Sequence, residues 1–229
     1  NEMLKAFKYR LYPTEAQAQQ IKQHVGACRF VYNWGLEQKI KSYEQTGKSI
    51  SRFDLNKKIT HELKPEHMWL KEVNSQSLQG AVKNLESAFT KFFREKKGFP
   101  KFKSKKNPSQ SFQVPQEYKV DFDHHKMRLP KIGWVKAVLH RKFEGLLKTA
   151  TVSINRTGKY FVSILVDDGY ELPPKETFDE ETTIGIDVGI THFATLSNGE
   201  KIKNPRYLKN SLKRLKVLQK RLSLSLIHI

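Results

Sequence analysis

The first part of the chain alternates between a short strand pattern and long helical patterns. Residues 3–12 alternate loosely between apolar and charged side chains, which predicts a strand ending at Pro13. Thr14 and Gln17 have the spacing of a capping box, so a helix is expected to begin there. Apolar side chains then recur at helical spacing up to Tyr43, with Gly26 as a point where the helix bends or divides.

Two further helices are predicted before the pattern changes. One begins at Ser51 and is expected to end at Pro65. The second covers residues 74–97 and carries an apolar stripe formed by Leu78, Val82, Leu85, Phe89 and Phe92. We therefore expect residues 14–97 to form a mostly helical unit.

Short strands and turns replace the helical pattern after residue 106. The strands are expected near residues 111–114, 118–123, 126–129, 132–140, 148–155 and 159–166. Residues 155–159 suit a hairpin turn with Gly158 at a positive φ. Strands of this length and spacing indicate a small β-barrel, which the N-terminal strand could close, with the helical unit as an insertion.

A second fold is predicted near the C-terminus. Residues 167–181 contain seven acids and two prolines, which is typical of an exposed linker. Strands are then expected at 183–188, 191–197 and 200–203, the last two joined by an Asn198-Gly199 turn, followed by a helix over 206–223. Residues 224–229 break the preceding charged pattern, and we interpret them as a non-native tail of an open reading frame cut inside its gene.

The charge balance points to a polyanionic partner. The 229 residues include 42 Lys and Arg against 23 Asp and Glu, a formal net charge of +19. Nucleic acid is the first candidate and an anionic membrane surface the second. No apolar run approaches the roughly 18 residues of a membrane span, and no secretory signal begins the chain, so we expect a cytoplasmic, nucleoid-associated protein of prokaryotic type. Cys28 is the sole cysteine, which excludes a cysteine-based zinc ribbon in this chain.

Asp187 is the principal candidate for catalysis. It is the one charge within Ile184–Thr191, a run that otherwise suits a buried strand, where an ionised carboxylate needs a metal or polar partners. Mg²⁺ or Mn²⁺ would suit its oxygens, and the neighbouring Gly185 and Gly189 would admit a phosphate or metal. Two alternative roles for Asp187 remain open. Its carboxylate could accept hydrogen bonds from the following turn, or the segment could be the phosphate-binding first strand of an actin-like ATPase.

Two basic segments are candidates for nucleic-acid binding. Residues 94–106 interleave cations with Phe99 and Phe102, so phosphates and unpaired bases could both be bound. The candidates there are Lys96, Lys97, Lys101, Phe102 and Lys103. The helix over 206–221 adds Lys213 and Arg214 opposite its leucines. A solvated lysine surface is the alternative for both segments.

The polar side of the helix over 74–97 offers amides suited to base edges. Asn and Gln pair well with adenine in the major groove. The polar residues on this side are Asn74, Ser75, Gln76, Gln79, Lys83 and Asn84. Helix capping and solvation account for the same residues, and chemistry alone favours that alternative.

Four motifs in order resemble the TnpB/OrfB proteins of transposons. They are Lys5–Thr14 (KAFKYRLYPT), Ala27–Asn33 (ACRFVYN), Gly98–Lys103 (GFPKFK) and Gly185–Gly189 (GIDVG). Members of that family act in transposition and as RNA-guided DNA endonucleases. The resemblance implies a multidomain α+β fold: a wedge-like β-barrel from residues 1–13 and 107–166, an inserted helical recognition domain over 14–106, an acidic linker over 167–181, and the first part of an RNase H-like (RuvC) nuclease over 182–223.

The resemblance also implies roles for single residues. Asp187 would be the first catalytic carboxylate and metal ligand, while Arg52, the helix beginning at Asn74, Phe112 and Gln113 would lie beside a short duplex motif flanking the target. Guide RNA and target DNA would be the partners, with no membrane. The full-length form would hydrolyse DNA with Mg²⁺.

This chain departs from the family pattern, because the second-motif Glu, the third-motif Asp and the zinc ribbon are missing. We therefore expect it to be inactive in cleavage, and the alternative function is a catalytically dead, repressor-like nucleic-acid-binding protein.

Overall fold

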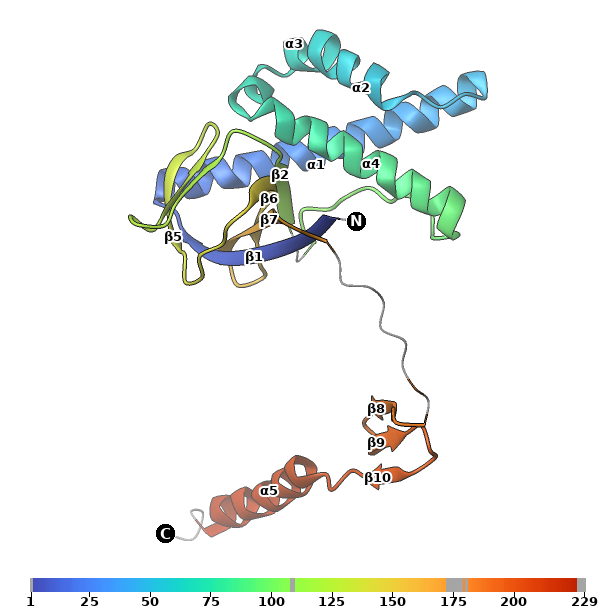
Figure 1. Ribbon diagram of the computed structural model, residues 1–229, viewed down its shortest axis with the longest axis vertical. Coiled ribbons are helices and arrows are strands. Elements are labelled where there is room, and N and C mark those ends of the chain that lie inside the picture. Colours follow the sequence, from blue (N-terminus) through green and yellow to red (C-terminus); the bar gives the residue numbers. More distant parts are fainter. Residues whose placement is uncertain (1, 108–109, 172–178, 180, 226–229) are drawn as a thin grey trace. The chain divides into compact units, whose positions relative to one another are not determined.

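The computed structural model describes residues 2–107, 110–171, 179 and 181–225 (Figure 1). The chain divides into two compact units, Asn1–Leu172 and Pro173–Ile229. The first unit is a mixed α+β arrangement that contains a large antiparallel sheet, and the second contains a small sheet and one helix. No helix in the described part of the chain has the length and apolarity to cross a membrane.

The N-terminal strand and helix form as the pattern predicts. Strand β1 spans Glu2–Tyr12 and helix α1 spans Glu15–Thr46, ending at Gly47 with φ 70°. The predicted capping box is confirmed: the Thr14 Oγ1 accepts from the Gln17 N–H at 3.3 Å, and Gln17 Oε1 accepts from the Thr14 N–H at 3.1 Å. The predicted division at Gly26 is wrong, because α1 runs unbroken through it. One mid-helix glycine costs only about 1 kcal/mol, which burial of one side of α1 outweighs.

The helices after α1 are less regular than predicted. Helix α2 (Arg52–Lys58) begins at Ser51, whose Oγ accepts from the Asp54 N–H at 3.2 Å. Pro65 does not end the helical path, because a π-helical turn η1 (Ile59–Leu63) leads directly into α3 (Lys64–Glu66). Pro65 falls in the first turn of α3, where a missing N–H is tolerated. A 3₁₀ turn η2 (Met68–Glu72) precedes helix α4 (Ser75–Glu95).

The large sheet is antiparallel throughout and has β1 near its middle. Its other strands are β2 (Gln110–Val114), β3 (Lys119–Asp121), β4 (Lys126–Leu129), β5 (Gly133–Val138), β6 (Leu146–Ile154) and β7 (Tyr160–Glu171). The seven strands follow the order β2-β6-β7-β1-β5-β4-β3. Because β1 pairs with both β7 and β5, the helices α1–α4 are an insertion between two strands of one sheet.

Strand β7 continues five residues beyond its predicted end. Asp167 and Asp168 therefore lie in a strand and not in an exposed linker. Lysines explain how a strand accommodates these acids: Lys148 Nζ lies 3.1 Å from Asp167 Oδ2, and Lys5 Nζ lies 2.6 Å from Asp168 Oδ2. The rest of the expected linker falls mostly at residues 172–178 and 180, outside the described residues.

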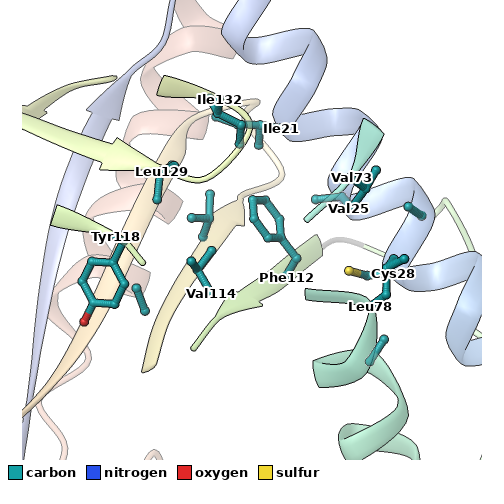
Figure 2. Packing of buried hydrophobic residues seen from close by; sticks show 14 of the residues in the cluster. Ile21, Val25, Cys28, Val73, Leu78, Phe112, Val114, Tyr118, Leu129 and Ile132 are labelled. Carbon is teal, nitrogen blue, oxygen red and sulfur yellow. The ribbon is translucent and has the colours of Figure 1, made fainter. Parts of the chain in front are cut away.

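One core joins the helices to the large sheet. Figure 2 shows Val25 and Cys28 of α1 and Leu78 of α4 close to Phe112 and Val114 of β2. His24 also contributes, since its ring centroid lies 5.0 Å from that of Phe112. The described α4 packs against β2 as well as α1. The core thus fixes α4 beside one edge of the sheet.

The second unit follows the predicted element order. Strands β8 (Ile186–Val188), β9 (His192–Leu196) and β10 (Lys201–Lys203) form a sheet in the order β10-β9-β8, and helix α5 spans Tyr207–Ser225. The expectation that β8 is a buried strand is wrong, because Ile186 and Val188 are 62% and 68% exposed. Helix α5 buries none of its described residues, so within this unit no layer covers β8.

Candidate nucleic-acid interface

A groove of about 710 Å³ lies between α2, α4 and β2. Several residues singled out in the sequence line it: Arg52 from α2, Gln76, Gln79 and Lys83 from α4, and Gln113 from β2. Asn56, Gln116 and Thr149 also line it. We call it the α2–α4–β2 groove. Residues far apart in the sequence therefore meet at one concave, mostly polar surface.

Helical spacing and a glycine bring the groove together. Positions 76, 79, 80 and 83 lie on one side of α4, because residues three and four apart are neighbours on a helix. At Gly80 a Cβ would lie 3.3 Å from Gln113 Oε1 and 3.5 Å from Gln113 Cβ. The absence of a side chain at Gly80 thus allows α4 to approach β2 closely enough to place the Gln113 amide beside the helix.

Arg52 is held on one wall of the groove. Its Nη1 lies 3.1 Å from Glu86 Oε2, and its guanidinium carbon lies 5.2 Å from the centroid of the Phe53 ring. The side chain is half-buried. A guanidinium carries five N–H donors, so the contact with Glu86 leaves donors for a ligand.

Two acceptors in the groove are buried without a partner. Gln76 Oε1 and Asn56 Oδ1 have no hydrogen-bond partner among the described residues. An unpaired buried acceptor costs about 1–3 kcal/mol. Both atoms are shielded from solvent, so a ligand in the groove would reach them only after these side chains rotate.

Three of the predicted contact residues have roles in the fold. Asn74 is 8% exposed and caps α4, where its Oδ1 accepts from the Gln76 N–H at 3.2 Å. Ser75 lies at the exposed start of α4, where its Oγ accepts from Lys64 Nζ at 2.8 Å. Phe112 is 3% exposed, because alternate residues of β2 face the core and Gln113 faces away from it. Phe112 therefore packs in the core and places Gln113 on the opposite side of β2.

The basic segment over residues 94–106 comprises the end of α4 and a loop beside the groove. Lys96 ends α4 at φ 51°, and Lys97 Nζ lies 2.8 Å from Glu95 Oε2. Lys101 is exposed, and Phe102 is 58% exposed. Lys103 is anchored, with its Nζ 4.0 Å from the centroid of the Tyr32 ring. Burial lowers the pKa of Lys103 from its usual value.

A smaller pocket connects this loop to the groove. Its volume is about 300 Å³, and its lining includes Cys28, Lys103, Asn84 and Gln113. Asn84 and Gln113 also line the α2–α4–β2 groove. The basic loop and the groove are therefore neighbouring parts of one surface.

Sequence reasoning missed a second concave surface and several groove residues, among them Asn56, Gln116 and Thr149. A depression of about 950 Å³ is lined by five cations from separate parts of the chain, Lys22, Arg29, Lys105, Lys106 and Arg156. Glu72 is the one acid among its lining residues. No local pattern marks it. Asn56 was missed for a similar reason, although its position one turn after Arg52 on α2 was an available signal.

Asp187 lies in the second unit and is exposed on β8. Its register partner is Thr195 of β9, and the adjoining Gly185 N–H donates to Ser197 Oγ at 3.0 Å. Among the described residues no group of three His, Cys, Asp or Glu side chains is placed to hold a metal ion. Lys213 and Arg214 lie on α5 and are also exposed. Within its described residues the structure therefore shows no metal-binding cluster of three such groups that includes Asp187.

Two family models match parts of the chain. Residues 3–48 match a "Helix-turn-helix domain" of the OrfB proteins, and residues 163–226 match a "Probable transposase" of the same group. In this chain the first match covers β1 and the single long helix α1.

Curated relatives match most of the chain. It is 33% identical over 221 residues to "Putative RNA-guided DNA endonuclease InsQ" of Escherichia coli (strain K12), which covers 96% of this chain and 54% of that protein. It is 33% identical over 230 residues to a "Putative RNA-guided DNA endonuclease" of Streptomyces pristinaespiralis, covering 97% and 55%. It is also 38% identical over 113 residues to "Virulence protein VsdF" of Salmonella dublin, covering 45% and 95%.

The chain spans about half the length of the endonuclease relatives it matches. A solved Cas12f1-sgRNA-target DNA complex aligns with a TM-score of 0.41 at 11% identity, covering 98% of this chain and 70% of that one. The ordered motifs, both family models and the relatives agree: the chain belongs to the TnpB/OrfB family of transposon proteins.

Proposed function

We propose that this chain is the nucleic-acid-binding portion of a TnpB-like RNA-guided DNA endonuclease and that it binds guide RNA and target DNA. The observation that carries the proposal is the α2–α4–β2 groove, where Arg52, Gln76 and Gln113 meet. The names of the endonuclease relatives support the choice of partners. The net charge of +19 supports binding to a polyanion.

The groove would bind the short duplex motif that flanks the target. Glutamine amides pair with adenine and arginine pairs with guanine in the major groove, and each good bidentate pair contributes about 1–3 kcal/mol of discrimination. Gln76 and Asn56 line the same groove, and their amides would meet base edges once these side chains rotate. Lys83 would contact a phosphate. Specificity along the rest of the target would come from base pairing with the guide.

The finer architecture is part of the same proposal. The large sheet would be a wedge-like barrel, the helices α1–α4 its recognition insertion, and residues 182–223 the beginning of a RuvC-like nuclease fold. Asp187 would be the first metal ligand of a full-length form that hydrolyses DNA phosphodiesters with Mg²⁺.

The described residues do not fit a two-metal centre, because such a centre needs several carboxylates and no group of three candidate ligands includes Asp187. We therefore expect this chain to bind nucleic acid without cutting it. The same observation favours a second candidate function, a catalytically inactive, repressor-like binding protein.

Selection from a duplex DNA library with a randomised stretch tests the proposal. The purified chain, with and without RNA transcribed from its own flanking DNA, should enrich a short motif. Gln76→Ala with Gln113→Ala should reduce the preference for that motif about tenfold or more, a loss of roughly 1.4 kcal/mol or greater.

Gln45→Ala provides the matched control, because it removes an exposed amide near the end of α1. The preferred motif should persist in this variant. Binding of all duplexes with equal affinity by the parent chain would overturn the proposed role of the groove.

A further inference from the structure

An ion pair between Arg52 and Glu86 links α2 to α4 beside the α2–α4–β2 groove. Arg52 is the first residue of α2, and Glu86 lies on α4 one helical turn beyond Lys83. Among the described residues, the lining of the groove includes the cations Arg52 and Lys83 and no acid. Glu86 is not part of that lining, so its carboxylate acts on the groove through Arg52.

Folding stability gives only a weak reason for this ion pair. The side chains of Arg52 and Glu86 are 32% and 46% exposed, and ion pairs that reach solvent contribute little to stability. The hydrophobic core already holds the two helices together, because Leu55 of α2 and Leu85 of α4 are fully buried and both lie against Gly35 of α1. The core therefore joins α2 to α4 whether or not the ion pair forms.

The ion pair has a larger effect on the direction of the Arg52 guanidinium. Glu86 Oε2 lies 3.1 Å from Arg52 Nη1, and the Phe53 ring centroid lies 5.2 Å from the guanidinium carbon, so two contacts restrict this group. An unrestrained arginine beside a duplex has phosphate oxygens as its commonest acceptors. The Glu86 carboxylate also repels phosphates from this end of the groove. The remaining N–H groups of Arg52 are thereby kept for an acceptor inside the groove.

We propose that Glu86 is a positioning residue, which directs Arg52 to a guanine edge of the flanking duplex and away from the phosphates. The inference rests on the proposed function and names the residue on which base discrimination by Arg52 depends. Guanine presents two acceptors, O6 and N7, in the major groove, and an arginine binds both only when its guanidinium lies in the plane of the base. A phosphate sets no such requirement and carries no sequence information. Glu86 thus makes a general cation selective.

Glu86→Gln tests the inference, because it keeps the size of the side chain and removes its charge. Glu62→Gln is the matched control: Glu62 Oε2 lies 3.1 Å from Lys58 Nζ, so the control removes the same charge from an ion pair whose residues do not line the groove. Each substitution is made alone and together with Arg52→Ala. Affinities are measured for duplexes that carry the selected motif or one changed base pair, at several salt concentrations. Thermal midpoints verify that each variant folds.

Glu86→Gln should reduce the preference for guanine about tenfold at the one position where Arg52→Ala also reduces it. Its slope of log affinity against log salt should steepen by about 0.9, because the released Arg52 gains a phosphate contact. Glu62→Gln should leave the base preference unchanged. In the Arg52→Ala background, Glu86→Gln should have no further effect on the preference, since the two residues act as one unit. A role of Glu86 in stability alone would not produce this dependence on Arg52.

If Glu86→Gln fails to fold, Glu86→Asp keeps the charge, shortens its reach and should show a smaller loss of the same preference. An unchanged guanine preference in the Glu86 variant, or an equal change in the Arg52→Ala background, would overturn the inference. The same conclusion would follow if Arg52→Ala reduced the preference at no position, because Arg52 would then contact only the backbone. These results leave motif selection by the parent chain intact and reject this inference alone. A parent chain that binds all duplexes equally would reject the proposed role of the groove as well.

Discussion

Asn33 and Lys103 hold each other through two reciprocal hydrogen bonds, although they are 70 residues apart. The Asn33 Nδ2 donates to the Lys103 carbonyl at 3.0 Å, and the Lys103 N–H donates to Asn33 Oδ1 at 2.7 Å. The two residues end the second and third of the motifs found in the sequence. One long-range contact thus joins the two motifs: the Asn33 side chain of α1 holds the Lys103 backbone and so fixes the basic loop.

Removal of this contact should loosen the basic loop. Asn33→Ala leaves the backbone of Lys103 without its partners, and two net hydrogen bonds are worth about 1–3 kcal/mol. Hydrogen exchange at the Lys103 amide should accelerate, and the free energy of unfolding should decrease by about 1–2 kcal/mol in urea. Gln45→Ala is the control. Unchanged exchange at Lys103 would contradict the assigned role of Asn33.

His24 should make stability depend on pH. Burial lowers its pKa from the ordinary value of 6.5, and the neutral ring bridges Gln20 and Asn74: its Nδ1 lies 2.8 Å from the Gln20 carbonyl oxygen, and its Nε2 accepts from the Asn74 N–H at 3.2 Å. Because the folded state favours the neutral ring, its stabilising effect is complete above pH 6.5. The effect is lost as the pH falls from there through the lowered pKa.

The prediction is measured by urea unfolding at pH 7.5 and pH 5. The parent chain should lose more stability between these pH values than His24→Gln, which cannot take up a proton. The other histidines titrate in both proteins, so the difference isolates His24. Parallel pH profiles for the two proteins would exclude a role for His24 in coupling α1 to the start of α4.

Two glycines of α1 should respond oppositely to alanine. At Gly26 the nearest atom to an added Cβ is the Arg29 Nη2 at 3.9 Å, so Gly26→Ala should stabilise the chain by about 0.5–1 kcal/mol. At Gly35 a Cβ would lie 3.1 Å from the Leu85 Cδ2 in the core. Gly35→Ala should therefore be neutral or destabilising, by up to about 1–3 kcal/mol. The thermal midpoints of both variants and the parent chain, measured under the same conditions, show whether each substitution raises or lowers stability.

The purified chain should not cut DNA in Mg²⁺ or Mn²⁺. One carboxylate cannot hold two metal ions in the arrangement that in-line displacement needs. Asp187→Ala should then leave RNA and DNA affinity unchanged, within about twofold, because Asp187 is not among the residues lining the α2–α4–β2 groove. Metal-dependent cleavage that disappears in Asp187→Ala would contradict this prediction directly.

Local signals predicted the beginnings of elements well. Thr14, Ser51 and Asn74 each cap the helix that the sequence assigns to them, since capping depends on atoms within three residues. Interruptions were predicted less well. Gly26 and Pro65 are unfavourable in isolation, yet the burial of Leu55, Ile59 and Leu63 continues the helical path up to Pro65.

Tertiary placement lay beyond the sequence pattern. The grouping of Arg52, Gln76 and Gln113 depends on the approach of α4 to β2 at Gly80, which no local period encodes. Phe112 was assigned to the interface by resemblance alone, although the alternation of β2 would have placed it in the core. The burial expected for β8 required a covering layer that the described second unit does not contain.

The central position of β1 has a consequence for biosynthesis. Strand β1 leaves the ribosome well before its neighbours β5 and β7, which begin only at Gly133 and Tyr160. Until those segments emerge, the strand has two unpaired edges, which are sites for mispairing with other chains. The α1–α4 insertion can pack meanwhile, because its contacts are more local. A nascent chain should therefore acquire its helices early and its sheet last, with chaperone dependence concentrated in that interval.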